Sequence, residues 1–177
     1  MDDHGRMALN RALMLGAIAP AVLLATAMGM QHGLGLVPCE MCLEQRTALW
    51  IAMALACIGM LLRRLAIGRA MAPASAVAMA ASGGIAIHQL GGERHWWILH
   101  TPCASTIGKS GNALDEIMKV PYVRCDVPQW QWMGLTMADL NALACMTTFT
   151  VMAWLVVKGA MREWKTRERM LPQHEED

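Results

Sequence analysis

Four long apolar stretches dominate the pattern of hydrophobic and polar residues along the chain. They cover approximately residues 12–30, 43–62, 71–90 and 138–157. Each approaches the roughly 20 apolar residues that a helix needs to cross the hydrocarbon core of a bilayer. Alanines fill much of the third stretch, and small residues allow helices to pack closely in lipid. The pattern predicts an all-α membrane protein, in which residues 1–160 form a four-helix transmembrane bundle and residues 161–177 form a tail.

The first apolar stretch has a second interpretation as a cleaved signal peptide. Arg6 and Arg11 precede its apolar centre, and Ala25-Thr26-Ala27 has the small-residue pattern of a cleavage site. Three further apolar stretches follow it, so a retained membrane helix is the more economical interpretation.

The composition supports a membrane protein and excludes other classes. Hydrophobic residues make up 55% of the 177 residues, charged residues only 16%, and the mean hydropathy is +0.33. An ordinary soluble domain has about 25% charged residues. Disordered chains are far more polar than this one. A net charge of +1 without a basic stripe argues against nucleic-acid binding.

The distribution of Lys and Arg predicts the orientation in the membrane. Ten of the 15 lie in the N-terminal segment, in the turn around 63–69 and in the tail. Cytoplasmic loops carry an excess of these residues, so we expect both termini to be cytoplasmic. Two loops, about 32–45 and 91–136, then face the other side. Residues 112–120 of the second loop have the pattern of a short amphipathic helix, which can lie on the membrane surface or pack within the loop.

Four of the six cysteines fall in these two outward loops, namely Cys39, Cys42, Cys103 and Cys125. Disulfides persist on the outer side of a bacterial inner membrane. Four cysteines allow three pairings. Cys39 and Cys42 form a C-x-x-C unit, a motif typical of redox sites, which leaves Cys103 and Cys125 as a candidate pair across the second loop.

The C-x-x-C unit is expected to open a helix, because Pro38 precedes it and the apolar run begins at Leu43. Cys42 then lies in the first turn, where the partial positive charge of the helix terminus favours a thiolate. Arg46 lies four residues later on the same helical face. Its guanidinium can stabilise that thiolate and a negative charge on a bound acceptor, although two nearby glutamates oppose this effect.

Two other interpretations of the four outward cysteines remain open at this point. The first is a structural zinc site completed by histidines, for which His32, His95 and His100 are candidates. The second is a pair of purely structural disulfides. Cys57 and Cys145 lie within apolar stretches and are interpreted as packing residues.

Several motifs resemble the DsbB family of disulfide bond formation proteins. The first loop resembles that family in the run Pro38-Cys39-Glu40-Met41-Cys42-Leu43-Glu44-Gln45-Arg46. Later residues follow in the family's order, namely His88, Glu93, Trp96, Trp97, Pro102, Cys103, Arg124-Cys125-Asp126, Trp130, Gly134-Leu135-Thr136-Met137-Ala138 and Asn141. The chain departs from the family at Glu44, where members often have an aromatic residue.

This resemblance implies a quinone-dependent protein-disulfide oxidoreductase of the bacterial inner membrane, which reoxidises a DsbA-like periplasmic thioredoxin-fold oxidant. It implies that Cys103 and Cys125 accept electrons from DsbA and pass them to Cys39 and Cys42. The final acceptor would be ubiquinone or menaquinone, held near Cys42 and Arg46. His88, an ionisable residue near the outer end of the third stretch, is a further candidate for this quinone site.

Two alternatives to this function are kept. A DsbB-like oxidase could serve a dedicated partner with the same chemistry. A non-catalytic membrane scaffold could use the same cysteines only to brace its loops. In each case the protein is expected to be embedded in membrane lipid and to bind no nucleic acid.

Overall fold

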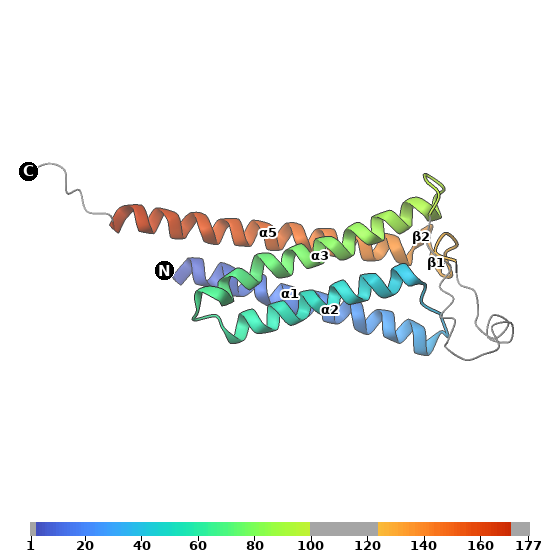
Figure 1. Ribbon diagram of the computed structural model, residues 1–177, viewed down its shortest axis with the longest axis horizontal. Helices are drawn as coiled ribbons and strands as arrows, with labels where there is room; N and C mark the ends of the chain where they lie inside the picture. The colour runs from blue at the N-terminus through green and yellow to red at the C-terminus, as the bar shows by residue number, and fades with distance from the viewer. Residues whose placement is uncertain (1–2, 100–123, 171–177) are drawn as a thin grey trace, which may run out of the picture.

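The computed structural model describes residues 3–99 and 124–170, which form four long helices and one short hairpin. The helices are α1 (Asp3–Gly33), α2 (Glu40–Leu61), α3 (Ala66–Glu93) and α5 (Met137–Met170). All four are long and apolar enough to cross a membrane (Figure 1). The predicted four-helix membrane bundle is therefore confirmed, whereas the short helix predicted at 112–120 lies outside the described residues.

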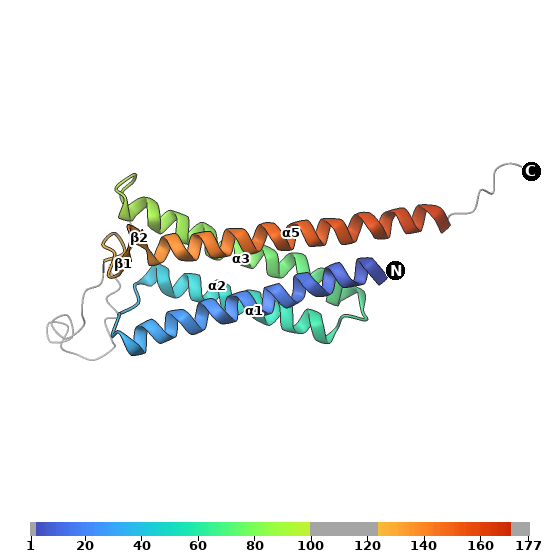
Figure 2. The same cartoon turned by 180° about the vertical axis from the view of Figure 1, so that it is seen from behind.

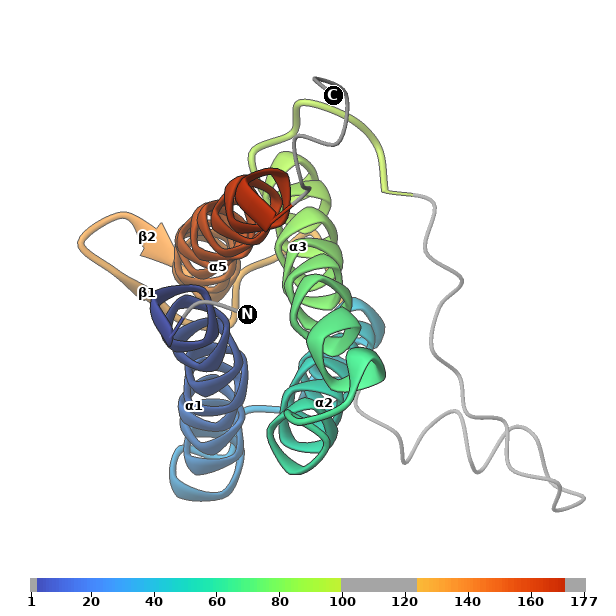
Figure 3. The ribbon, with the colours of Figure 1, turned by 90° about the vertical axis from the view of Figure 1, so that its left-hand side faces the viewer.

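The helices occupy the four corners of an elongated bundle when it is viewed end on (Figure 3). Helices α1 and α3 each pack against both α2 and α5. The start of α1, the turn between α2 and α3 and the end of α5 lie at one end of the bundle (Figure 2). The start of α2 and the hairpin lie at the other end, so the described parts of the two predicted loops share one side.

The helices extend further than the apolar stretches that predicted them. Helix α5 continues to Met170, so the predicted tail over 161–177 begins as a helix. The residues that extend α5 are mostly good helix formers such as Lys, Arg, Glu and Met. The Trp164 indole also donates a hydrogen bond to Glu168, one turn later, at 2.8 Å. The loss of hydrophobicity therefore marks the edge of the apolar segment and not the end of the helix.

Small residues and serine hydroxyls hold the centre of the bundle together. Ser75 Oγ donates to the Ala52 carbonyl at 2.9 Å, and Ser82 Oγ donates to the Gln45 carbonyl at 3.2 Å. Both bonds run from α3 to the backbone of α2. In lipid, buried polar groups need partners within the protein, and such bonds between helices supply them. They fix α3 against α2 near the functional site.

The outer face of the bundle is apolar, as expected for a surface that contacts lipid. Ile18 and Val77 have 61% and 65% of their surface exposed. The predicted packing role of the two cysteines within the helices applies to only one of them. Cys145 is completely buried, whereas Cys57 is exposed on the outer face of α2.

The turn between α2 and α3 depends on a glycine. A Cβ atom at Gly68 would lie 2.1 Å from the backbone carbonyl oxygen of Leu62. That carbonyl also accepts a hydrogen bond from the Leu65 backbone N–H at 2.8 Å, so it cannot shift freely. The close contact therefore requires glycine and fixes the path of the turn.

Replacing Gly68 with Ala is expected to lower the free energy of unfolding by about 1–3 kcal/mol, because the backbone must move to relieve the overlap. Gly84, within α3, is the matched control, because nothing lies within 4 Å of a Cβ placed there. Gly84→Ala should be neutral or stabilising by up to about 1 kcal/mol, the gain in helix propensity. Thermal unfolding in detergent measures both variants. Equal stability of the two would contradict the close contact.

Candidate active site

The C-x-x-C unit lies at the beginning of α2, as predicted. Cys39 caps the helix with an extended backbone (φ −78°, ψ 171°), and the helix starts at Glu40. The Leu43 backbone N–H donates to the Cys39 carbonyl at 3.2 Å. Cys42 consequently lies in the first helical turn, among the backbone N–H groups that favour a negative charge.

Cys39 and Cys42 are thiols in this structure, and a hydrogen bond distinguishes them. The Cys39 thiol donates to Cys42 Sγ at 3.0 Å. This bond raises the pKa of Cys39 above its ordinary value, and burial raises the pKa further. Cys39 therefore keeps its proton in the reduced pair. The Cys42 sulfur, which accepts the bond, is the better place for a negative charge.

Cys125 joins this pair from the second loop. It is buried in one cluster with Cys39 and Met41, and Cys42 packs against the same cluster. A hydrogen-bond contact with Cys125 also contributes to the raised pKa of Cys39. The structure thus brings together three of the four outward cysteines, while Cys103 lies outside the described residues.

Gln129 connects the segment that carries Cys125 to the segment before Cys39. Its side-chain oxygen accepts a hydrogen bond from the Val37 backbone N–H at 3.2 Å, and its Nε2 donates to the Val37 carbonyl at 2.6 Å. The side chain therefore pairs with the backbone as a neighbouring strand would. Sequence reasoning missed Gln129, because an amide in a loop has no spacing that reveals its partner.

Two charged residues flank Cys125 and pair with one another. Arg124 Nε donates to Asp126 Oδ1 at 2.9 Å, and Arg124 Nη2 also contacts the other carboxylate oxygen. The hydrogen bonds from Arg124 hold the pKa of Asp126 below its usual value. Asp126 therefore stays ionised to a lower pH than an unpaired aspartate would, and the ion pair flanks the buried thiol on both sides in the sequence.

Arg46 lies one helical turn after Cys42, as the spacing predicted. Its guanidinium donates to the Gln31 side-chain oxygen and, at 3.2 Å, to the Ala27 carbonyl, both near the end of α1. In the part of the chain that the structure describes, no carboxylate pairs with Arg46. Cys42 and Arg46 together line two adjoining cavities of about 70 and 130 Å³.

The larger of these two cavities fits a flat ring that carries polar oxygens. Leu23, Met30 and Leu49 supply apolar walls, and Arg46 and Gln89 supply hydrogen-bond donors. Ligand sites typically combine apolar walls with a few polar groups that fix the orientation. A quinone has this combination of an apolar ring and two carbonyl oxygens, so the residues present fit its headgroup.

A chain of amide side chains borders the larger cavity. Asn141 Nδ2 donates to Gln45 Oε1 at 2.7 Å, and Gln45 Nε2 donates to Gln89 Oε1 at 2.9 Å. Gln89 Nε2 then donates to Glu93 at 2.9 Å. The Cys42 thiol contacts the same Gln89 oxygen at 3.9 Å. Sequence reasoning missed this chain as a unit, although polar residues within apolar stretches are a general signal for function.

His88 does not reach this site. It is exposed on α3, where its ring stacks on Trp97 with the ring centroids 5.6 Å apart, and its carbonyl accepts a hydrogen bond from the Trp97 indole at 3.1 Å. It is absent from the lining of both cavities at Cys42, whereas its neighbour Gln89 lines both. The geometry therefore favours Gln89 for the position that the sequence analysis gave to His88.

A hairpin and a capping box position the start of α5 beside the cavity. Strands β1 (Gln131–Trp132) and β2 (Leu135–Thr136) are antiparallel, and the turn between them has positive φ angles at Met133 (50°) and Gly134 (81°). Such turns favour glycine. Thr136 and Asp139 then exchange side-chain to backbone hydrogen bonds at 2.9 and 3.3 Å, which cap the helix. These contacts account for Gly134, Thr136 and Asp139 within the Gly134–Asn141 region.

The described residues do not form a ligand set for the zinc site considered above. Within residues 3–99 and 124–170, no group of three or more His, Cys, Asp or Glu side chains is placed to hold a metal ion. Cys39, Cys42 and Cys125 instead pack with apolar side chains such as Ile85 and Leu99.

Comparison with known proteins gives a consistent family. The family model of the disulfide bond formation protein DsbB matches residues 9–155. Disulfide bond formation protein B of Aromatoleum aromaticum is 30% identical over 162 residues, which cover 84% of this chain and 92% of the relative. The protein of the same name from Chromohalobacter salexigens is 28% identical over 139 residues, covering 78% and 74% of the two chains. No solved structure matches. With a family match over most of its length and four helices able to cross a membrane, this chain belongs to the DsbB family of disulfide bond formation proteins.

Proposed function

We propose that the protein is a quinone-dependent thiol oxidase of the bacterial inner membrane. It takes two electrons and two protons from the dithiol of a DsbA-like periplasmic protein and passes them to ubiquinone or menaquinone. One observation carries this proposal: Cys125, Cys39 and Cys42 cluster beside a cavity lined by Arg46, at one end of a bundle able to span the membrane.

The first steps are two thiol–disulfide exchanges. The partner's thiolate attacks Cys103 of a Cys103–Cys125 disulfide, which forms a mixed disulfide and releases the Cys125 thiolate. Cys125 packs against Cys39, so it attacks that sulfur of the Cys39–Cys42 disulfide, and Cys42 leaves as a thiolate. The better a sulfur bears negative charge, the faster it leaves. The first helical turn and the nearby Arg46 both favour Cys42 in this role.

The remaining exchanges complete the transfer. The partner's second thiolate attacks its own sulfur in the mixed disulfide, so the partner leaves oxidised and Cys103 is released. Cys103 then attacks Cys125 in the Cys39–Cys125 disulfide and restores the outer pair. Cys39 takes up a proton, in agreement with its raised pKa. Two electrons now reside on the reduced Cys39 and Cys42.

The inner pair is reoxidised at the cavity. Cys39 and Cys42 would return to the disulfide by giving up two electrons and two protons, and a quinone held at the cavity would supply the acceptor and leave as the quinol. Arg46 would hold a quinone oxygen by a charge-assisted hydrogen bond. Gln89 would orient the ring, and Leu23 and Leu49 would exclude water from it.

The orientation in the membrane belongs to the same proposal. The start of α1 and the α2–α3 turn lie at the bundle end away from the start of α2 (Figure 1), and they carry Arg6, Arg63 and Arg64. Because Lys and Arg concentrate on the cytoplasmic side, that end and both termini would be cytoplasmic. The cysteines would then face the oxidising periplasm, where a soluble dithiol partner can reach them.

The function is tested with the purified protein in detergent, a reduced DsbA-like protein and a short-chain ubiquinone or menaquinone. We expect one quinol for each partner disulfide formed, followed by quinone absorbance. Exchanging the DsbA-like protein for other thioredoxin-fold dithiols separates a general oxidase from one with a dedicated partner. A folded protein that reduces no quinone with any of them, and whose disulfides resist mild reduction, would be a braced scaffold instead.

The role of Gln129 in positioning Cys125 gives a further prediction. In a Cys42→Ala/Cys103→Ala background, where neither natural partner can compete, mild oxidation should trap a Cys39–Cys125 disulfide, which peptide mass mapping can quantify. Gln129→Ala should lower its equilibrium constant by about fivefold or more, because two hydrogen bonds to Val37 are lost and each contributes roughly 0.5–1.5 kcal/mol. Gln131→Ala, an exposed glutamine in the same hairpin region, is the control. If the two variants trap the disulfide equally well, Gln129 does not position Cys125.

A further inference from the structure

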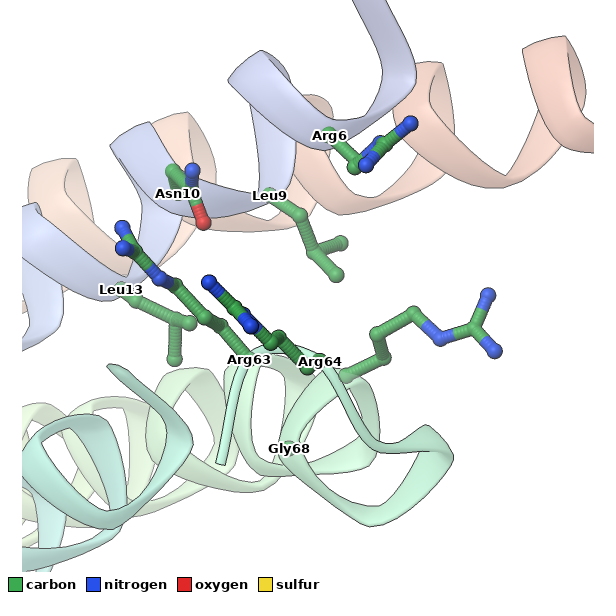
Figure 4. A pocket seen from close by; sticks show the side chains of 8 residues that line it. Arg6, Leu9, Asn10, Leu13, Arg63, Arg64 and Gly68 are labelled. Carbon is green, nitrogen blue, oxygen red and sulfur yellow. The ribbon is translucent and has the colours of Figure 1, made fainter. Parts of the chain in front are cut away.

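A large cavity lies at the end of the bundle opposite the cysteines. It has a volume of about 620 Å³ and lies between α1, the α2–α3 turn and the first residues of α3. Arg6, Leu9, Asn10 and Leu13 come from α1, and Arg63 and Arg64 come from the turn on the other side (Figure 4). The oxidase chemistry proposed above uses none of these residues.

Arginines supply most of the polar lining of this cavity. Four arginines line it, and no carboxylate of the described residues does. Glu163 of α5 pairs with one of them, Arg69, at 3.1 Å. In residues 3–99 and 124–170 no carboxylate pairs with Arg63 or Arg64, which are both exposed. Such a concentration of guanidinium groups favours an anion with several oxygens, above all a phosphate.

The polarity of the cavity changes along α1. Arg6 lies nearest the start of the helix, Leu9 and Asn10 lie one turn further in, and the buried Leu13 lies deepest. Across the cavity, the Arg63 side chain reaches toward Asn10 and Leu13, so charged and apolar groups share the site (Figure 4). A phospholipid likewise combines an anionic phosphate with apolar acyl chains. A free phosphate would match the arginines but would leave the leucine walls without a partner.

The turn that carries two of the arginines is held in place. The close approach of Gly68 to the Leu62 carbonyl and the hydrogen bond from Leu65 to the same carbonyl fix its path. Arg63 and Arg64 are therefore presented from a defined backbone opposite α1. A site formed in advance loses less conformational freedom when it binds a ligand.

We propose that this cavity binds an anionic phospholipid from the leaflet at that end of the bundle, with its phosphate at Arg63 and Arg64 and its acyl chains against Leu9 and Leu13. Basic pockets between membrane helices are a known mode of anionic lipid recognition. The inference is independent of the thiol chemistry and goes beyond it, because it assigns a second ligand to a separate site.

The test uses the delipidated full-length protein in a neutral detergent. Phosphatidylglycerol, phosphatidylcholine with the same acyl chains, and inorganic phosphate are titrated separately, and native mass spectrometry and thermal unfolding report binding. Phosphatidylglycerol should bind to the protein and raise its unfolding temperature, because a ligand of the folded state stabilises it. Phosphatidylcholine and inorganic phosphate should have little effect.

The variant Arg63→Gln/Arg64→Gln should weaken phosphatidylglycerol binding by about 25-fold, since each arginine beside an anionic lipid contributes about fivefold. Arg11→Gln/Lys165→Gln is the matched control, because it removes the same charge from exposed positions outside the cavity lining. An equal loss in this control would overturn the proposal in favour of general electrostatic attraction. Equal binding of both lipids would also overturn it, and so would equal stabilisation by inorganic phosphate.

Discussion

Replacing Cys42 with Ser is expected to lower quinone reduction with a reduced DsbA-like partner by at least about a thousandfold, because loss of a reacting nucleophile removes most of an enzyme's rate enhancement. Serine cannot form the inner disulfide, and its oxygen cannot pass electrons to the acceptor. Cys39→Ser should have a similarly large effect, since the two sulfurs act as one pair. Turnover is measured from quinone absorbance in detergent.

Cys57→Ser provides the control for both variants. Cys57 lies on the same helix but is exposed on the outer face of the bundle, away from the cysteine cluster. The Cys57→Ser variant should reduce quinone at the same rate as the unmodified protein. Substantial activity in Cys42→Ser would mean that electrons reach the quinone by a route that bypasses the C-x-x-C unit.

Arg46→Gln should raise the apparent KM for quinone by roughly 10- to 100-fold. A hydrogen bond to a charged group contributes about 1.5–3 kcal/mol, and each 1.4 kcal/mol is a factor of ten. Arg46→Lys keeps the charge but loses the planar donor pair. Its apparent KM for quinone should therefore lie between those of the unmodified protein and Arg46→Gln. Initial rates at varied quinone concentration and saturating reduced partner measure the effect.

A structural role of Arg46 can be separated from quinone binding. The guanidinium also joins α2 to α1 through Gln31 and the Ala27 carbonyl, so Arg46→Gln could loosen this end of the bundle. The unfolding temperature of each variant is therefore measured beside its KM, with Arg11→Gln at the opposite end as a charge control. An unchanged KM in a less stable Arg46→Gln variant would assign the residue to structure alone.

The helices and the start of the site could be predicted from the sequence because their signals are local. Apolar length predicts a membrane helix wherever it occurs. The change from Pro38 to the apolar run at Leu43 placed Cys42 in the first turn of α2, and a spacing of four residues placed Arg46 on the same face. These inferences need no knowledge of which helices are neighbours.

The rotation of each helix could not be predicted. In a soluble protein one apolar face points inward, but a membrane helix is apolar on nearly all sides, so its pattern does not indicate which face points inward. His88 and Gln89 are adjacent in the sequence, yet α3 turns Gln89 into the site and leaves His88 stacked on Trp97. Only the packing of the bundle distinguishes the two residues.

Contacts between distant segments were also beyond the sequence. Cys125 shares a cluster with Cys39, and Gln129 pairs with Val37. Gln45, Gln89 and Asn141 meet from three different helices. No spacing along the chain encodes such contacts. The end of α5 lies later than the apolar stretch predicted for another reason. The charged residues after that stretch are themselves good helix formers and continue the helix.

A single-turnover experiment tests the central claim most directly. The reduced Cys103→Ala/Cys125→Ala variant, in which no outer pair can exchange with the inner disulfide, is mixed anaerobically with one equivalent of quinone and no partner. Quinol is measured beside the free thiols, which are located by alkylation and mass spectrometry. The account predicts one quinol per protein, with the loss of two thiols at Cys39 and Cys42. Quinol formation with both of these thiols still free, or with the oxidation confined to other cysteines, would contradict it.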